Sequence, residues 1–197
     1  MTHIDNMSHI FAYGMTHVDS LERNPIYVAI GNTDIIAVRN NRLLANGRMV
    51  GSYLPFYFGY HTPMLYVIQN GYTGVAKVNP EEIIYCVTSV QVLLDSGKDF
   101  LFTDGQANSA LTSCFLKSDI QRIEDLLDFS IINSKDWSNT NEDPDRKRRK
   151  ESELLLDGDL PVNCILGYVC YNEQAKVQLM ALGIVEEKIA VRSNYYF

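Results

Sequence analysis

Two prolines enclose most of the chain's densest aromatic stretch and restrict the structure that it can form. Residues 53–66 read YLPFYFGYHTPMLY, with Pro55 and Pro63 inside the stretch. Proline lacks an amide hydrogen and clashes with the preceding helical turn, so no helix is expected through the first half. The run PMLYVI, which starts at Pro63, is predicted to be a strand or the start of a short buried helix. The aromatic side chains fit core packing, and they equally fit a platform on which a nucleotide base stacks.

The rest of the chain mixes short apolar runs with helical patterns, which indicates an α+β fold with several non-contiguous strands. Extended runs are expected at residues 26–30, 81–94, 99–107, 151–156, 162–171 and 188–197. Helices are expected at 5–13 between Asp5 and Gly14, from Ser118 with a Ser118–Gln121 capping box, and after Asn172 with Gly183 near its end. The segments between them are polar, namely 33–52 with an Asn46–Gly47 turn and 133–148 with the single Trp137.

Composition limits the class of protein. The 197 residues are 46% hydrophobic, which suits one compact domain over residues 1–197. The four cysteines show no CxxC spacing, and no Cys/His cluster has zinc-ligand spacing, so we expect no metal and a reduced, cytoplasmic setting. The opening MTHIDNMSHI has neither a basic head nor a long apolar run, so no signal peptide is expected, and no run reaches transmembrane length.

A basic run stands out in this acidic chain. Residues 146–150 read RKRRK, and without these five charges the formal net charge of -7 would be -12. Most charge runs are solvated loops, which is the default interpretation here. The functional alternative is a patch that contacts nucleic-acid phosphates, because bound Lys and Arg displace counterions. The acidic residues on both sides, such as Asp145 and Glu151, weaken that alternative.

Two glutamates follow the basic run and lead into three leucines. Glu151 and Glu153 are two residues apart, so they point to opposite faces of a strand, and at most one of them faces a given cleft. Glu151 is expected at the surface and Glu153 nearer the core, because Glu153 directly precedes Leu154. A carboxylate at the edge of a buried strand near arginines is a candidate catalytic group, and an ion pair with a neighbouring arginine is an equal alternative.

Several motifs, in this order along the chain, resemble the DarT family of DNA ADP-ribosyltransferase toxins. THIDN followed by I..YG resembles the opening of the family, and AIGNTDIIAVRNNR resembles its arginine segment. YLPFYFGYHTPMLY is similar to the signature aromatic stretch and is the most specific match. FTDGQA, the stretch from the single tryptophan through DPDRKRRKESELLL, and the terminal NYYF complete the resemblance over nearly all of the chain.

The resemblance implies a fold, a reaction and partners. The fold would be an ADP-ribosyltransferase-like split β-sandwich with flanking helices that holds NAD+, a substrate, in a cleft. The reaction would be a pentosyl (glycosyl) transfer of ADP-ribose from NAD+ to a base of single-stranded DNA, usually thymidine, with release of nicotinamide. The protein would be the toxin of a bacterial toxin–antitoxin pair, opposed by a DarG-like macrodomain antitoxin. We expect a cytoplasmic monomer with no membrane partner.

The resemblance also assigns roles to residues. Glu153, rather than Glu151, matches the catalytic glutamate, and Arg39 matches the essential arginine, with its neighbour Arg42 as the assignment to test against it. The expected NAD+-binding residues are His3, Arg39, Tyr57, Met64 and Tyr66. The expected DNA-binding residues are Gln106, Arg146, Lys147, Arg148, Arg149 and Lys150.

The sequence departs from the family pattern at Gln106, where the family often has histidine, and few residues precede His3. Two other functions stay open. One is a non-catalytic module that binds single-stranded nucleic acid through the aromatic stretch and the basic run. The other is a relative that modifies RNA or protein.

Overall fold

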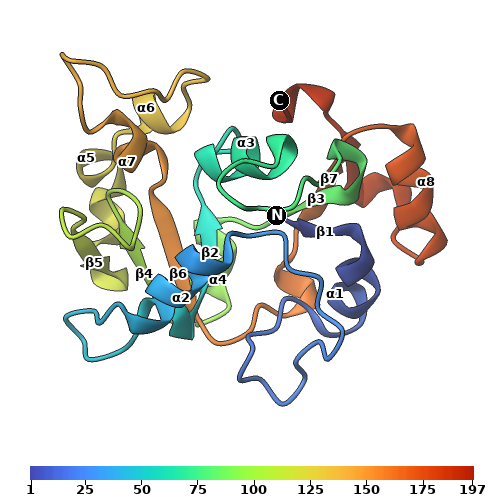
Figure 1. Cartoon of the computed structure of the whole chain (residues 1–197). Coiled ribbons are helices and arrows are strands. Elements are labelled where there is room, and N and C mark those ends of the chain that lie inside the picture. The colour runs from blue at the N-terminus through green and yellow to red at the C-terminus, as the bar shows by residue number, and fades with distance from the viewer. The chain divides into compact units, whose positions relative to one another are not determined.

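The computed structural model describes residues 1–197, which fall into two compact units (Figure 1). Unit 1 comprises Met1–Gly31, Val67–Lys98 and Gly158–Phe197, and unit 2 comprises Asn32–Tyr66 and Asp99–Asp157. Each unit contains one four-stranded sheet. None of the helices combines the length and the apolar character needed to cross a membrane. The expectation of a single domain stays a prediction.

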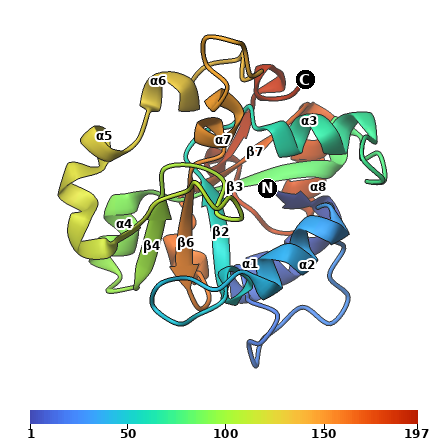
Figure 2. The ribbon, with the colours of Figure 1, turned by 60° about the vertical axis from the view of Figure 1, so that its left-hand side comes forward.

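Unit 2 is an antiparallel sheet with short helices. Its strands, in the spatial order β2-β6-β4-β5, are β2 (Tyr53–Tyr57), β6 (Glu153–Asp157), β4 (Phe100–Thr103) and β5 (Cys114–Leu116). Its helices are α2 (Thr33–Asn41), α5 (Ile123–Leu126), α6 (Phe129–Ile132) and α7 (Arg146–Lys150), and α3 (Pro63–Asn70) runs from unit 2 into unit 1. Figure 2 shows α7 where β6 begins.

The strand β6 is the centre of this sheet because β2 and β4 pair with it on either side. Its three leucines, Leu154 to Leu156, are buried, as expected for a strand covered on both faces. Leu155 packs with Val50, Tyr53, Leu101 and Ala107 in one core cluster. Burying a leucine fully contributes about 1.5–3 kcal/mol, so these three residues fix the position of β6 and of its first residue, Glu153.

Unit 1 has a mixed sheet in the order β1-β3-β7-β8. The strands are β1 (Thr2–His3), β3 (Ile83–Val87), β7 (Gly167–Cys170) and β8 (Ile189–Val191), and the helices are α1 (Met7–Tyr13), α4 (Val90–Asp95) and α8 (Glu173–Ala181). Only β7 and β8 are parallel, and α8 forms the crossover that a parallel pair requires. Asn172 caps α8 by accepting a hydrogen bond from the amide of Ala175 at 3.0 Å.

Several predicted elements are confirmed. Strands form at 100–103 and 153–157, no helix passes through the first half of 53–66, and PMLYVI begins a helix, one of its two predicted states. The glycine positions also agree: α1 ends at Gly14 with φ 86°, and Gly47 turns the chain with φ 81°. These are left-handed conformations that only glycine adopts without strain.

Two expectations for unit 1 are wrong, namely the strand at 26–30 and the cap at Asp5. Residues 26–30 form no strand, because the amide and the carbonyl of Val28 bond to the side chain of Asn6, each at 2.8 Å. A side chain therefore replaces the partner strand. Asp5 does not cap α1, which begins after Asn6 without a side-chain cap; Asp5 lies in a preceding 3-10 turn over Ile4–Asn6, where the Nδ1 atom of His3 accepts a hydrogen bond from the amide of Asp5 at 3.2 Å.

The expected strand at 81–94 is only partly right. It ends at Val87, and Ser89 then caps α4 by accepting from the amide of Val92 at 3.2 Å. The final strand is likewise shorter than expected, since it covers only Ile189–Val191 and a 3-10 turn follows at Ser193–Tyr195.

The expected helix from Ser118 is a 3-10 turn over Lys117–Arg122 followed by the single turn α5. The Ser118–Gln121 capping box is wrong: the acceptor is the Asp119 carboxylate, which takes the amide of Leu116 at 3.1 Å. The helix α2 lies in the segment expected to be only polar. Its signal is the Asn32 cap, whose side chain accepts from the amides of Asp34 and Ile35.

Candidate active site

Glu153 and Arg39 form a buried ion pair in unit 2. Glu153 is the first residue of β6, and Arg39 lies near the end of α2. The Arg39 Nη1 atom donates to both carboxylate oxygens of Glu153, at 2.8 and 3.1 Å. The Glu153 side chain is 1% exposed and that of Arg39 13% exposed. The carboxylate is thus paired with a guanidinium in a place with little water.

The loop after β4 also holds Glu153. The amide of Ala107 donates to Glu153 Oε1 at 3.0 Å, and the amide of Glu153 donates to the Thr103 hydroxyl at 3.1 Å. That hydroxyl donates in turn to the carbonyl of Gly105 at 2.7 Å. The carboxylate is therefore held by a guanidinium and a backbone amide, and its own backbone is tied to the end of β4.

Tyr57 lies directly opposite Glu153 in the pairing of β2 with β6. Residues opposite each other in an antiparallel pair share a face of the sheet, so the two side chains are neighbours. Burial raises the pKa of Tyr57 well above its usual value, and the negative charges of Glu153 and Glu151 raise it further. The positive charge of Arg39 acts in the opposite direction and lowers this pKa. The phenol thus stays protonated and can donate a hydrogen bond. Its hydroxyl lies 3.8 Å from the sulfur of Met64.

Glu151 is buried, so the expectation that it lies at the surface is wrong. Burial raises its pKa to about 7, Lys147 acts against this rise, and Glu153 adds to it. The sequence argument assumed that 151 belongs to the strand, but the residue instead ends α7, where strand alternation does not apply.

The basic run forms α7 and is not a solvated loop. Lys150 is 1% exposed, and its Nζ atom donates to the carbonyls of Ile132 and Ser134 at 2.5 and 2.6 Å. Burial lowers the pKa of Lys150 to about 8. Arg149 is paired with Asp128 and with Asp143. The charged groups of Arg149 and Lys150 are therefore engaged by other residues of the protein.

Lys147 is the exposed member of the run. Its ammonium lies over the ring of Trp137, 5.8 Å from the centroid, and Trp137 meets Tyr66 edge-on with centroids 5.6 Å apart. Arg146 pairs with Asp136 at 3.8 Å. Tyr66, one of the expected binding residues, thus sits beside the tryptophan of the polar loop and a surface lysine.

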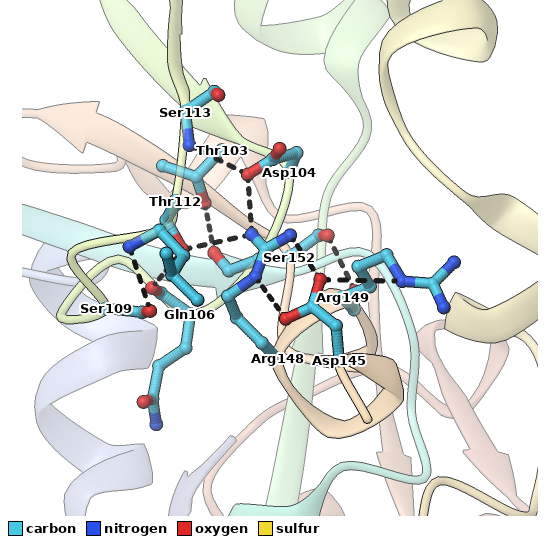
Figure 3. A network of polar contacts seen from close by, with 12 residues as sticks. Thr103, Asp104, Gln106, Ser109, Thr112, Ser113, Asp145, Arg148, Arg149 and Ser152 are labelled. Atoms are coloured by element: carbon cyan, nitrogen blue, oxygen red, sulfur yellow. Dashed lines mark hydrogen bonds and ion pairs between the residues drawn. The ribbon is translucent and has the colours of Figure 1, made fainter. Parts of the chain in front are cut away.

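Arg42, the alternative to Arg39, has a different environment. Its Nη2 atom lies 3.4 Å from the carbonyl of Ser109, whereas the Glu153 carboxylate accepts from Arg39 and the amide of Ala107. Gln106 binds through its backbone: its amide donates to the carbonyl of Arg148 at 2.9 Å, and its carbonyl accepts from the Thr112 hydroxyl at 2.8 Å. Its side-chain amide extends away from this network (Figure 3).

His3 belongs to unit 1, where it starts the chain's first turn. Its Nδ1 atom accepts from the amide of Asp5, so the proton of a neutral ring is on Nε2, which lies 3.9 Å from a carboxylate oxygen of Glu82. The roles expected for His3 and for the other residues matched to the family stay predictions.

Four buried side-chain polar atoms of unit 2 have no hydrogen-bond partner, namely Arg39 Nη2, Arg42 Nε, Asn108 Oδ1 and Arg146 Nε. Arg39 Nη2 is a donor beside Glu153, and Asn108 Oδ1 is an acceptor in the loop after β4. Such atoms are rare in folded proteins because each costs about 1–3 kcal/mol. A donor and an acceptor of this kind fit a phosphate-and-amide ligand such as NAD+. No group of three or more His, Cys, Asp or Glu side chains is arranged to hold a metal ion.

Sequence reasoning missed the groups that support Glu153. The amide of Ala107 carries no side-chain signal, and neither does the pairing of Tyr57 with Glu153 across two strands. The available signal was Thr103, a hydroxyl at the end of an apolar strand just before a glycine. Such a residue commonly bonds to nearby backbone, as it does here.

Comparison with known sequences gives consistent matches. The family model described as ssDNA thymidine ADP-ribosyltransferase, DarT, matches residues 1–197. A DNA ADP-ribosyl transferase of Escherichia coli is 27% identical over 202 residues, 100% of this chain and 91% of that protein. A DNA ADP-ribosyl transferase–DNA ADP-ribosyl glycohydrolase fusion protein of Thermosipho africanus is 30% identical over 157 residues, 79% of this chain and 37% of the fusion.

Solved structures share the fold. Thermus sp. 2.9 DarT in complex with ADP-ribosylated ssDNA matches with a TM-score of 0.86 at 23% identity, over 100% of this chain and 93% of that chain. Thermus sp. 2.9 DarT in complex with NAD+ matches with a TM-score of 0.80 at 22% identity, over 100% and 94%. The predicted α+β, ADP-ribosyltransferase-like fold is confirmed. With a family match that spans every residue, this chain belongs to the DarT family of single-stranded-DNA thymidine ADP-ribosyltransferases.

Proposed function

We propose that this chain transfers ADP-ribose from NAD+ to a thymidine base of single-stranded DNA and releases nicotinamide. The observation that carries the proposal is the buried Glu153 carboxylate, held by Arg39 and the amide of Ala107 in a chain that matches DarT throughout. The Thermus relative has been solved with NAD+ and with ADP-ribosylated ssDNA, the substrate and product classes of this reaction.

Glu153 is the proposed catalytic residue. NAD+ supplies the ADP-ribose and the nicotinamide leaving group. Positive charge builds on the ribose as the bond to nicotinamide breaks, and a fixed carboxylate in a dry site stabilises that charge more than it stabilises the ground state. The same carboxylate is a candidate base for the N3 proton of thymine, because Arg39 and the amide of Ala107 hold it in one orientation.

Arg39 has two proposed roles that its geometry supports. One guanidinium nitrogen, Nη1, orients Glu153. The other, Nη2, is buried without a partner and is available for a pyrophosphate oxygen or a base carbonyl. Arginine suits both roles because its planar fork stays charged at any physiological pH.

The remaining proposed binding roles rest on the family resemblance and, for some residues, on their contacts in unit 2. For NAD+ we propose Tyr57, which lies opposite Glu153, Met64, whose sulfur lies 3.8 Å from the Tyr57 hydroxyl, and the family-matched Tyr66 and His3. For DNA we propose Lys147, which is exposed beside Trp137, and with it Arg146 and Gln106. An aromatic ring and a cation side by side suit a single strand, which stacks its bases and carries phosphates. The roles predicted for Arg148, Arg149 and Lys150 stay predictions, and their engaged donors count against them.

We also propose a partner and a setting. The Thermosipho relative joins a DNA ADP-ribosyl transferase to a DNA ADP-ribosyl glycohydrolase in one chain. A DarG-like macrodomain antitoxin that removes the modification is therefore the proposed partner of this chain, within a toxin–antitoxin pair. The proposed form is a monomer that works in the cytoplasm without a membrane partner.

The test is incubation of the purified chain with NAD+ and, separately, a thymidine-containing oligonucleotide, RNA and a protein mixture. Nicotinamide release with a mass increase confined to the oligonucleotide supports the proposal. Oligonucleotide binding without nicotinamide release would identify a non-catalytic binding module. A mass increase on RNA or protein alone would identify a relative with another acceptor. Either of these two results would overturn the proposed function.

A further inference from the structure

Arg148 is the centre of a polar network that joins α7 to the loop after β4 (Figure 3). Its Nη1 atom donates to Asp104 at 2.8 Å and to the Thr112 hydroxyl at 3.2 Å. Its Nε and Nη2 atoms donate to the two oxygens of Asp145, at 2.8 and 2.7 Å. Every nitrogen of the guanidinium is thus engaged within unit 2, and the side chain is only 14% exposed.

The backbone of Arg148 holds the same loop. Its carbonyl accepts the amide of Gln106 at 2.9 Å. Gly105 lies so close that a Cβ atom there would stand 2.8 Å from that carbonyl and 2.4 Å from Arg148 Nη1. Only glycine lets the loop approach this closely, so contact with Arg148 is built into the shape of the loop.

The same loop also contacts Glu153, the proposed catalytic residue. Ala107, next to Gln106, donates its amide to Glu153 Oε1 at 3.0 Å. Gly105 accepts from Thr103, whose hydroxyl also receives the amide of Glu153. The loop after β4 therefore connects Arg148 with the side chain and the backbone of Glu153.

Other parts of α7 do not share this arrangement. Arg149 turns to Asp128 and Asp143, and Lys150 to the carbonyls of Ile132 and Ser134. These contacts hold the segment before α7 rather than the loop after β4. Charged hydrogen bonds to two carboxylates also raise the pKa of Arg148, with Asp145 as the largest cause, so the guanidinium keeps its charge.

We infer that Arg148 is a positioning residue for Glu153: it clamps the loop of residues 104–112 so that the amide of Ala107 meets the carboxylate. It does so in place of the DNA contact that the basic run suggests. The catalytic consequence rests on the proposed function, whereas the clamp itself is a property of the folded chain. A catalytic group displaced by about 1 Å can cost on the order of 10²-fold in rate.

The first test is amide hydrogen exchange of the full-length protein without substrates. Arg148→Met is expected to speed exchange in residues 105–109, and Arg148→Lys to speed it less, because lysine keeps the charge but cannot bridge Asp104 and Asp145. The matched control is Arg48→Met, which also removes an arginine–aspartate pair, but Arg48 contacts Asp157 and the ring of Tyr53 rather than residues 104–112. Unchanged exchange at 105–109 in Arg148→Met would overturn the clamp, whether or not the chain is active.

The second test uses nicotinamide release with NAD+ and a thymidine-containing oligonucleotide. Arg148→Met is expected to lower kcat by about 10²-fold with the salt slope of DNA binding unchanged, because a positioning residue displaces no counterions. Its effect on kcat should be non-additive with that of Asp104→Asn, since the two side chains act through one contact. A reduced salt slope with kcat unchanged would instead make Arg148 a DNA contact.

A milder variant covers the case in which Arg148→Met does not fold. Thr112→Val removes the hydroxyl that links Arg148 to the carbonyl of Gln106 and leaves both carboxylate pairs in place. It is expected to speed exchange at 105–109 and to lower kcat by a smaller factor. If folded Thr112→Val keeps the exchange rates and the kcat of the unmodified chain, the loop does not depend on the Thr112 hydroxyl, and this result would count against the clamp. If the unmodified chain releases no nicotinamide, the proposed function fails and the exchange measurement still decides the clamp.

Discussion

Arg39 contacts Glu153 through one nitrogen and leaves the other without a protein partner. Nη1 lies 2.8 and 3.1 Å from the two carboxylate oxygens, while Nη2 is buried and makes no hydrogen bond. A planar guanidinium can serve two acceptors at fixed angles, so a group that orients the carboxylate can also bind an anionic or carbonyl oxygen. A lysine at this position, with its single nitrogen, could not make both contacts in this geometry.

Arg39→Lys should lower kcat/KM for NAD+ by about 10²–10³-fold, the usual cost of losing one fixed charged donor at a reacting centre. Lysine keeps the charge but offers a single nitrogen. The measurement is nicotinamide release at varied NAD+. Arg42→Lys is the matched control, because Arg42 lies three residues away and has no bond to Glu153. A large loss in Arg42→Lys with normal rates in Arg39→Lys would reverse the assignment.

Glu151 should make the protein less stable as pH rises. Its pKa is 4.5 in an ordinary setting and about 7 in the folded state, so the folded chain holds the proton more tightly than the unfolded chain. That stabilisation is full below pH 4.5 and is lost as pH rises through 7, a change of about 3 kcal/mol from the 1.36 kcal/mol per pKa unit.

Glu151→Gln removes this titration. Its free energy of unfolding should exceed that of the unmodified chain at pH 8 and lose the advantage near pH 4, as urea denaturation at the two pH values would show. The same pH dependence in both proteins would mean that Glu151 titrates normally.

Lys147 and Lys150 should behave differently although both belong to the basic run. Lys147→Gln should reduce the slope of log K for DNA binding against log salt by about 1, the value for one phosphate contact. The measurement is oligonucleotide binding at several salt concentrations. An unchanged slope would mean that Lys147 touches no phosphate.

Lys150→Met is the matched comparison. It should leave the salt slope unchanged and lower the free energy of unfolding by about 1–3 kcal/mol, because two buried carbonyls lose their donor. A flatter slope in Lys150→Met with unchanged stability would show that Lys150 reaches the DNA after all.

The sequence predicted the parts of the site that lie on regular elements. ESELLL is recognisable as a buried strand with a carboxylate at its start, and the cap Asn172 and the turn glycine Gly47 act through local backbone geometry. Local rules suffice there because the residue and its partner are near in sequence.

What the sequence did not predict depends on partners far apart in the chain. The charge of Lys150 suggested solvent, but carbonyls 16 and 18 residues earlier bury it. Residues 26–30 read as a strand because their apolar pattern cannot reveal that Asn6 occupies their backbone groups. Glu151 was wrongly expected at the surface because it caps the C-terminal end of α7. The strand β6 starts only at Glu153, so strand alternation does not apply to residue 151.

The most direct test uses the full-length Glu153→Gln variant, with its fold verified by thermal melting. The measured quantities are nicotinamide release and the mass of the oligonucleotide. Glutamine keeps the size of the side chain and an acceptor for the amide of Ala107 but removes the charge. The expected result is a loss of about 10²–10⁴-fold with no modified oligonucleotide, while Glu151→Gln keeps a larger share of the rate. Folded Glu153→Gln that modifies the oligonucleotide at the unmodified chain's rate would contradict the assignment of Glu153 as the catalytic carboxylate.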